Sequence, residues 1–156
     1  MGGNEEQAVA PVLFYMQEFY CLDNFSAFKV LWQGTEYMTA EHAYQAAKFD
    51  HLQTMGNYIC GASSAHEAKR IAKTFAHHVR PDWSEVRVAV MEDVLRAKMH
   101  QHEFVREKLL ETGDREIIED SPKDTFWGRG PNGDGENNVG KIWMKLRAEL
   151  QKEASR

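Results

Sequence analysis

Two segments of the chain, 64–67 and 82–85, have the pattern of a capping box, in which Ser or Asp is followed three positions later by Glu. Such a pair satisfies backbone N–H groups that have no partner inside the first turn of a helix. We therefore predict helices over residues 65–75 and 83–100. These two helices are the first indication that the fold is rich in α structure.

The other elements follow from caps, stops and turns. Thr39 is a residue type that caps a helix, Gly113 is the type that ends one, and Gly34 gives a hairpin turn its backbone freedom. The further elements expected are helices over 40–49, 102–112 and 139–152, a hairpin over 28–38, and short extended segments over 12–15 and 116–119. The expected fold class is mainly α, a single compact helical domain with a small N-terminal β element.

At 156 residues the chain suits one domain, which we place at 11–152, between a flexible N-terminal tail at 1–10 and a C-terminal tail at 153–156. Its 28% charged and 42% apolar residues are typical of a soluble globular protein. No apolar run approaches the ~20 residues that cross a bilayer, and the N-terminus lacks the apolar core of a signal peptide. The two cysteines make no disulfide framework, so we expect a cytoplasmic protein without membrane contact.

The spacing of the cysteines and histidines and the net charge exclude some classes of function. Neither cysteine has the spacing of a zinc site and the histidines are scattered, so we expect no metal and no cofactor. The net charge of −5 weighs against a protein that grips duplex phosphates nonspecifically. It leaves open the recognition of a single modified nucleotide.

The helix predicted over 40–49 carries polar residues on one stripe. Glu41, Tyr44, Gln45 and Lys48 recur at intervals of three and four positions, which places them on one face of a helix. Charged stripes of this kind usually face solvent. The other interpretation is a carboxylate and an amine that line a pocket, and the spacing alone leaves both open.

The helix predicted over 83–100 has cations inside its apolar face. Arg87 and Lys98 either pack their stems and keep their charges at the rim, or point into an interior that holds an anion. Trp83, on the same helix, is either a core residue or a stacking surface for a planar ligand.

The loop over 120–138 is unusual for a connection, because it carries Trp127 among several glycines. An indole outside regular structure needs a surface to cover or a planar ligand to stack on. Gly128 would let backbone amides approach a phosphate or a sugar. Asn138 either caps the last helix or stands at a helix N-terminus that suits an anion.

Several motifs together indicate a family. They are Leu22-Asp23-Asn24-Phe25-Ser26, Glu41-His42-Ala43-Tyr44-Gln45-Ala46-Ala47-Lys48-Phe49, Arg80-Pro81-Asp82-Trp83, Asp124-Thr125-Phe126-Trp127-Gly128 and Asn138-Val139-Gly140. In order and spacing, the chain from about Phe14 to Leu150 resembles the NADAR, or YbiA-like, family. The resemblance implies a mainly helical N-glycosidase. One branch of the family acts on reactive early intermediates of riboflavin synthesis, and another removes ADP-ribose from modified guanine bases.

The resemblance also implies roles for single residues in hydrolysis of a ribosyl C–N bond. Cleavage builds positive charge at C1 of the sugar, which a carboxylate stabilises while an acid protonates the leaving base. Glu41 and Asp124 are the candidates for these roles, with Glu119 in reserve. Lys48 either stabilises charge or forms a Schiff base with the opened ribose. The predicted substrate-binding residues are Asn24, Tyr44, Gln45, Trp83, Arg87, Lys98, Glu119, Trp127, Gly128 and Asn138.

Two substrate classes stay open on the sequence: ribosylamino-pyrimidine phosphates and ADP-ribosylated guanine in nucleic acid. The alternative function is a non-catalytic module that binds ADP-ribose or NAD. Such a module needs only stacking and phosphate-binding groups, whereas an enzyme also needs the acids and the lysine. Because all of these are present, we expect an enzyme, and the sequence does not indicate its oligomeric state.

Overall fold

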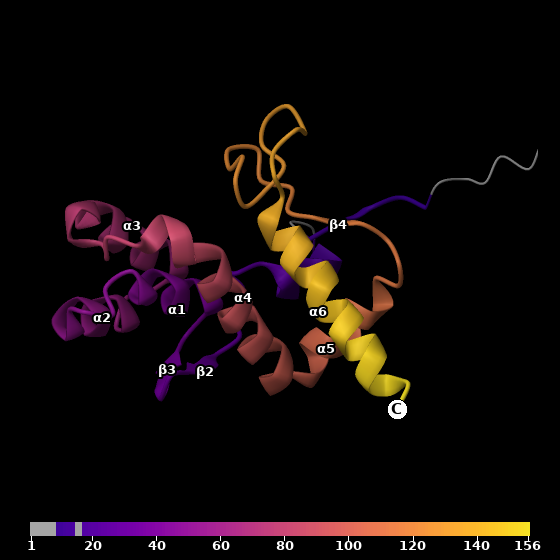
Figure 1. Cartoon of the computed structure of the whole chain (residues 1–156), viewed down its shortest axis with the longest axis horizontal. Helices are drawn as coiled ribbons and strands as arrows, with labels where there is room; N and C mark the ends of the chain where they lie inside the picture. The colour runs from indigo at the N-terminus through magenta and orange to yellow at the C-terminus, as the bar shows by residue number, and fades with distance from the viewer. Residues whose placement is uncertain (1–8, 15–16) are drawn as a thin grey trace, which may run out of the picture.

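A computed structural model describes residues 9–14 and 17–156 and shows a mainly helical fold (Figure 1), which confirms the predicted fold class. In this part of the chain the α-helices are α1 (Ala40–Ala47), α2 (Gln53–Cys60), α3 (Ala65–Thr74), α4 (Trp83–Gln101), α5 (Glu103–Glu111) and α6 (Asn138–Ala154). Two 3-10 segments are η1 (Gln17–Leu22) and η2 (Ala76–His78). The strands are β1 (Val12–Leu13), β2 (Val30–Trp32), β3 (Thr35–Tyr37) and β4 (Ile117–Ile118).

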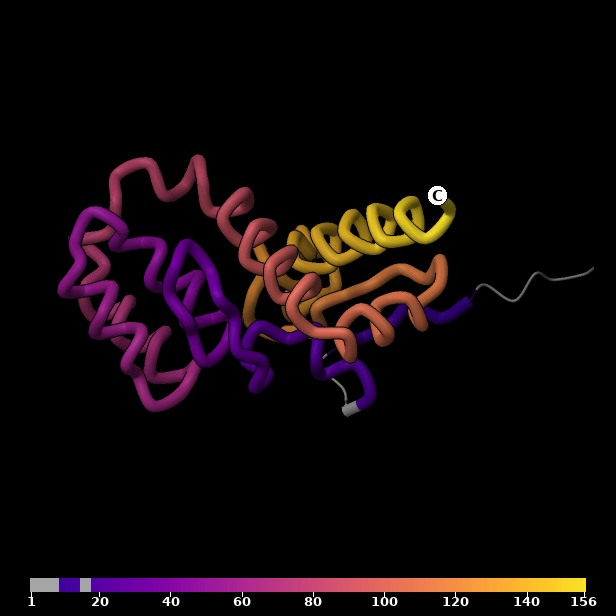
Figure 2. The backbone as a smooth tube through the Cα atoms, turned by 90° about the horizontal axis from the view of Figure 1, so that it is seen from below, coloured from indigo at the N-terminus to yellow at the C-terminus, as the bar shows by residue number. Residues whose placement is uncertain are grey.

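The long helix α4 runs between two groups of elements (Figure 1, Figure 2). On one side α1 packs against α2, α3 and α4, and α4 also packs against β2. On the other side α6 packs against β4, α5 and α4. Both groups therefore share α4 as part of their packing.

The strands β2 and β3 form the predicted antiparallel hairpin. Its turn residues, Gln33 and Gly34, have positive φ values of 48° and 80°. Two successive positive values are what a tight hairpin turn requires, and glycine takes such a value without steric cost. The prediction of a turn at Gln33-Gly34 is thus confirmed.

The strands β1 and β4 form a second pair, parallel, with Val12 opposite Ile117. The β structure is therefore not confined to the N-terminal part. Gly140 lets α6 approach β4 closely, because a Cβ atom there would lie 2.1 Å from the carbonyl oxygen of Ile117. Part of the strand expected over 12–15, and most of the tail predicted over 1–10, falls outside the described residues.

Two predicted helix caps are present and one is not. Thr39 and Ser64 each accept a hydrogen bond from the backbone N–H three residues on, at 3.2 and 3.1 Å. The cap predicted at Asp82 is wrong, although α4 does begin at Trp83. The Asp82 carboxylate instead accepts hydrogen bonds of 2.6 and 2.8 Å from Arg80, so the ion pair has replaced the cap.

The helix α2 was not expected from the sequence. Leu52 precedes it without a side-chain cap, and Gly56 lies in its interior, where glycine disfavours helix. Contacts with α1 and α3 hold it in place. At the other end of the chain α6 continues to Ala154, past the expected end at 152. None of the described helices combines the length and apolar character that crossing a bilayer needs.

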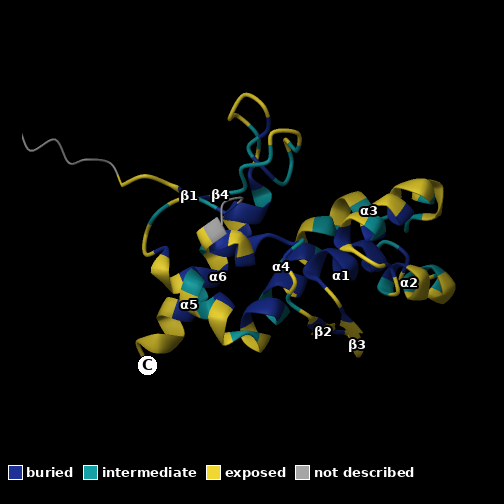
Figure 3. Ribbon diagram, turned by 180° about the vertical axis from the view of Figure 1, so that it is seen from behind, coloured by how far each residue is buried: buried dark blue, intermediate teal, exposed yellow. Residues whose placement is uncertain are grey.

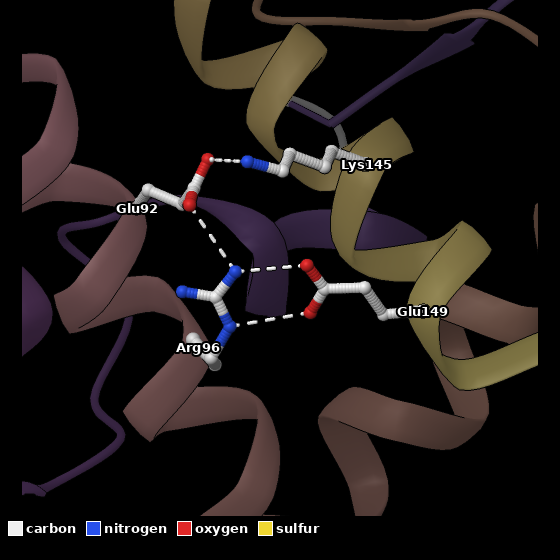
Figure 4. A network of polar contacts seen from close by, with 4 residues as sticks. All are labelled: Glu92, Arg96, Lys145 and Glu149. Atoms are coloured by element: carbon white, nitrogen blue, oxygen red, sulfur yellow. Dashed lines mark hydrogen bonds and ion pairs between the residues drawn. The ribbon is translucent and has the colours of Figure 1, made fainter. Parts of the chain in front are cut away.

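A network of four charged side chains joins α4 to α6 (Figure 4). Arg96 donates to both carboxylate oxygens of Glu149, at 2.8 and 3.2 Å, and to Glu92 at 3.1 Å. Lys145 completes the network with a 2.8 Å bond to Glu92. Because Arg96 and Glu92 are partly buried and each has two partners in the network, they orient the two helices more firmly than an isolated surface pair would.

Candidate active site

The polar stripe of α1 is buried, so the solvent-facing interpretation is wrong. Glu41 is 4% exposed and Gln45 is 3% exposed, in a helix whose residues are all buried (Figure 3). The helices α2, α3 and α4 pack against this helix. A carboxylate enclosed in this way needs a partner, and Gln45 Nε2 donates to Glu41 Oε1 at 2.7 Å.

The same burial shapes the chemistry of the Glu41 carboxyl. Burial raises the pKa of Glu41, and the hydrogen bond from Gln45 and the charges of Lys69 and Lys48 lower it only in part. The group is therefore more basic than an exposed glutamate. Glu41 is the second residue of α1, and one of its carboxyl oxygens accepts the hydrogen bond from Gln45.

Lys48 lies at the end of α1 and is half-buried beside two aromatic rings. Its Nζ lies 5.4 Å from the centre of the Tyr44 ring and 5.8 Å from that of Trp83. Burial lowers the pKa of Lys48, and the charges of Lys69 and Arg87 lower it further, against the opposing effect of Glu41. A lowered pKa leaves more of the amine neutral and nucleophilic at a given pH.

Aromatic side chains from three elements gather next to α1. The Tyr44 ring lies 5.2 Å from the Trp83 ring and 5.5 Å, edge to face, from the Trp127 ring. Phe126 packs edge to face on Trp127 at 4.8 Å. Trp83 and Trp127 are partly buried against the core, so each has a packed side and a side that is still accessible.

Arg87 is the cation of α4 that faces this aromatic cluster. Its guanidinium carbon lies 3.5 Å from the centre of the Phe126 ring, and its Nε is buried without a hydrogen-bond partner. Within residues 9–14 and 17–156, no ion pair includes Arg87, Lys48 or Lys69. Three cations therefore stand near the site with their charges uncompensated by a direct contact.

Glu119 follows β4, and its carboxyl is strongly perturbed. Burial, together with the charges of Asp23, Asp124 and Glu41, raises its pKa to about 8. Its Oε2 is buried and has no partner. At neutral pH this group therefore holds a proton, which an ordinary glutamate would have lost.

A second amide fixes the backbone of Glu119. Asn137 Oδ1 accepts from the N–H of Glu119 at 2.9 Å, and Asn137 Nδ2 donates to the carbonyl of Ile117 at 2.9 Å. Asn137 itself has a left-handed backbone with φ of 53°, which asparagine tolerates better than most residues. Asn137 thus ties the start of α6 to the end of β4.

Asp124 and Gly128 serve the loop itself. Asp124 Oδ1 accepts from the N–H groups of Phe126 and Trp127, at 2.9 and 2.7 Å, so one of its oxygens holds the turn that carries the indole. A Cβ at Gly128 would lie 2.9 Å from the carbonyl oxygen of Glu119. The close approach that glycine permits here is to the protein's own backbone, and the approach of its amide to a phosphate or a sugar stays a prediction.

Asn138 and Lys98 also make contacts that the sequence did not indicate. Asn138 Nδ2 donates to the carbonyl of Phe126 at 2.9 Å, so its side chain does not cap α6. Lys98 has no exposed surface and donates to the carbonyl of Asp23 at 3.0 Å. A phosphate could reach Lys98 only if this part of the core opened, which weighs against the predicted contact with substrate.

Four buried polar atoms near the site have no hydrogen-bond partner. In the described part of the chain they are Oδ1 of Asn24, Oε1 of Gln45, Nε of Arg87 and Oε2 of Glu119. Buried polar atoms in folded proteins nearly always have a partner. All four belong to residues that the sequence predicted for substrate binding.

Four residues near the site were missed as site residues. Asp23 is buried and its pKa is raised by that burial, and it lies in a segment that carried the family resemblance. Lys69 is exposed on α3, and no sequence signal distinguished it from the other lysines. Phe126 and Asn137 adjoin predicted residues, so closer attention to the loop would have found them. Within the described residues no three His, Cys, Asp or Glu side chains gather to hold a metal ion.

Replacing Trp127 by Ala is expected to weaken substrate binding by about 1–3 kcal/mol, the usual worth of an aromatic stacking surface for a base. Trp127→Phe should keep much of this binding, because it retains a ring against Tyr44. Kinetics should be measured beside thermal melts. A large loss of melting temperature with unchanged kinetics for the folded fraction would instead make Trp127 a core residue.

A mainly helical domain whose buried carboxyls, half-buried lysine and unpaired arginine converge on an aromatic cluster has the composition of an enzyme site. The NADAR domain family model matches residues 13–151, and the chain belongs to this family, as its motifs predicted. It is 35% identical over 144 residues to an N-glycosidase of Nostoc punctiforme, covering 90% of this chain and 92% of that protein. These matches confirm the predicted enzyme class, a hydrolase of N-glycosyl bonds.

Other relatives agree in sequence and in structure. The chain is 38% identical over 146 residues to a riboflavin biosynthesis protein of Vibrio vulnificus, covering 92% of this chain but only 40% of that longer protein. The NMR structure of Escherichia coli YbiA superposes with a TM-score of 0.84 at 31% identity, covering 97% of this chain and 93% of that one. The protein of the same name from this bacterium is called an N-glycosidase.

Proposed function

We propose that this chain hydrolyses the ribosyl C–N bond of a phosphorylated, nucleotide-like substrate. The observation that carries the proposal is that Asn24, Gln45, Arg87 and Glu119 each hold a buried polar atom without a hydrogen-bond partner, and that each of these residues interacts with Glu41, Tyr44 or Lys48. A polar substrate bound between them would supply the missing hydrogen bonds. The enzyme class of the relatives supports the same reaction.

The charged and aromatic groups support one orientation of the substrate. Arg87, which has no ion-pair partner within the described residues, suits phosphate oxygens. Trp83 and Trp127 suit the planar base, because both keep an accessible side beside Tyr44. The ribose then lies toward α1, where Asn24 and Gln45 can bond its hydroxyls.

Hydrolysis in this orientation uses two carboxyls in different roles. Glu41 is the group to stabilise positive charge at C1, or to activate water against it. Glu119 is the group to protonate the leaving base, since its pKa of about 8 keeps a proton on it at neutral pH. Asp124 has one oxygen committed to the loop turn, so it keeps a catalytic role only through the other.

Lys48 has two possible roles in this reaction. Its lowered pKa suits attack on C1 of the ring-opened glycoside, which breaks the bond from C1 to the base nitrogen and releases the base with a proton. The imine left between C1 and Lys48 is then hydrolysed by water, which frees the sugar and the lysine. As a cation it would instead neutralise a phosphate or a developing negative charge. The proposal favours the imine, because the side chain lies among rings and not beside a carboxylate partner.

The substrate we propose first is a ribosylamino-pyrimidine phosphate, supported by the name of the Vibrio relative and by a maize relative also named as a riboflavin biosynthesis protein. ADP-ribosylated guanine is the second candidate. It is favoured by the presence of three unpaired cations, Lys48, Lys69 and Arg87, which exceed what a single phosphate needs. A module that only binds ADP-ribose or NAD would show affinity without product.

Purified protein should be incubated separately with a ribosylamino-pyrimidine phosphate and with DNA that carries ADP-ribosylated guanine. Mass spectrometry of the released base and sugar decides between the two. Release of a free pyrimidine amine supports the first substrate, and recovery of unmodified guanine in the DNA supports the second. Absence of either product from a folded protein that binds ADP-ribose would replace the enzyme proposal with the binding module. Cytoplasmic localisation stays a prediction.

The turnover rate is expected to fall as pH rises through about 8, because Glu119 loses the proton that it donates. Its carboxyl pKa is raised, so the active protonated form is complete below this pH and disappears above it. Glu119→Gln should lower turnover and flatten this alkaline limb. Initial rates across pH 6 to 10 check the result, and a limb that survives in Glu119→Gln would assign it to another group.

A further inference from the structure

Lys98 is a charged side chain where the fold has no evident use for one. It lies in α4 with no exposed surface, among the largest fully buried side chains. No ion pair in the described chain includes it. Burying an ammonium group without a carboxylate contact destabilises a fold, and an apolar residue of the same length would avoid that penalty.

The ammonium group is bonded to one turn of the chain. Lys98 Nζ donates to the carbonyl of Asp23 at 3.0 Å and to the hydroxyl of Ser26 at 2.8 Å, and lies 5.2 Å from the ring centre of Phe28. Ser26 Oγ in turn lies 2.7 Å from the Asp23 carbonyl. The turn over 23–26 is therefore closed around the Lys98 cation.

This turn is connected directly to the site. The carbonyl oxygen of Asn24 accepts from the N–H of Glu41 at 3.1 Å, so the turn holds the start of α1. The Asn24 side chain has its Oδ1 buried without a partner, next to the carboxyl that we assign to catalysis. A shift of the turn would move both Asn24 and Glu41.

We propose that Lys98 is a positioning residue, whose buried ammonium fixes the 23–26 turn so that Asn24 and Glu41 meet the ribose in register. The catalytic roles of Asn24 and Glu41 in this inference rest on the proposed function. The fixing of the turn rests only on the hydrogen bonds that Lys98 makes. Lys98 contacts no substrate in this role. The buried ammonium group lowers the stability of the fold. In return it holds the 23–26 turn in the position that catalysis requires.

The test compares Lys98→Met, which keeps the length and removes the cation, with Met99→Leu, a conservative change at the next, equally buried position of α4. Lys98→Met is expected to fold, with a melting temperature at least that of the wild type. Its kcat should fall roughly tenfold to a hundredfold with KM nearly unchanged, as misplacement of a catalytic group does. Ser26→Ala, which removes one of the two acceptors, should give a smaller loss, and Met99→Leu none.

A second measurement does not depend on turnover. Hydrogen exchange of the Glu41 N–H, which donates to Asn24, should be faster in Lys98→Met than in the wild type or in Met99→Leu. Unchanged exchange and unchanged kcat in a folded Lys98→Met protein would overturn the proposal. If the wild type cleaves neither substrate while exchange still quickens in Lys98→Met, the proposed function fails and the positioning role stands.

Discussion

Glu41→Gln is expected to lower turnover by at least about a hundredfold, the scale on which a catalytic carboxylate contributes, while the fold stays intact. The glutamine has the same shape but cannot carry the negative charge that stabilises C1. The variant should fold because its side-chain oxygen can still accept from Gln45 Nε2. Initial rates with the substrate that the wild type cleaves check the first part.

Thermal melts check the second part. Burial raises the pKa of Glu41, so removal of its charge should leave the melting temperature unchanged or increase it. Glu85→Gln is a matched control, since Glu85 is an exposed carboxylate in the first turn of α4. Turnover by Glu41→Gln within a few-fold of the wild type would remove Glu41 from the catalytic groups.

Lys48→Arg is expected to be inactive and to bind substrate nearly as well as the wild type. Arginine keeps the positive charge beside Tyr44 and Trp83 but cannot form an imine. In the wild type, borohydride added during turnover should trap a covalent adduct, which peptide mapping would place on Lys48. Lys69→Arg is the control, because that lysine is nearby but exposed.

An active Lys48→Arg protein would exclude the covalent route. Lys48 would then act through its charge, and water activated by Glu41 would attack C1 directly. The same result would predict that no adduct forms under borohydride. Under either mechanism the activity of Lys48→Arg and the borohydride trapping should point to the same role for Lys48. An adduct formed by a protein whose Lys48→Arg variant is active would indicate trapping at an unrelated amine.

The helices were predictable where the signals are local. Ser64 and Thr39 cap their helices as expected, because a cap depends on a hydrogen bond within one turn. Asp82 looked equally suitable, but Arg80 lies close enough to bind both of its oxygens. The helix α2 could not be seen, because contacts with α1 and α3 stabilise a segment whose own sequence includes Gly56.

The sequence predicted which residues belong to the site but not how deeply they are buried. Helical periodicity placed Glu41, Gln45 and Lys48 on one face, yet nothing in the spacing says whether that face is covered. The covering elements, α3 and α4, come from elsewhere in the chain. Lys98 illustrates the same limit, since its partner Asp23 is 75 residues away and is a backbone carbonyl.

Both groups of elements share α4, and this has a consequence for how the protein unfolds. Removal of α4 would leave α1 without one of its packing partners and α6 without another, so neither group keeps a complete core on its own. The chain should consequently lose its structure in one cooperative step. The aromatic and charged groups at the beginning of α4 should then show no unfolding transition separate from that of the domain. Loss of activity on heating should therefore coincide with unfolding of the whole domain.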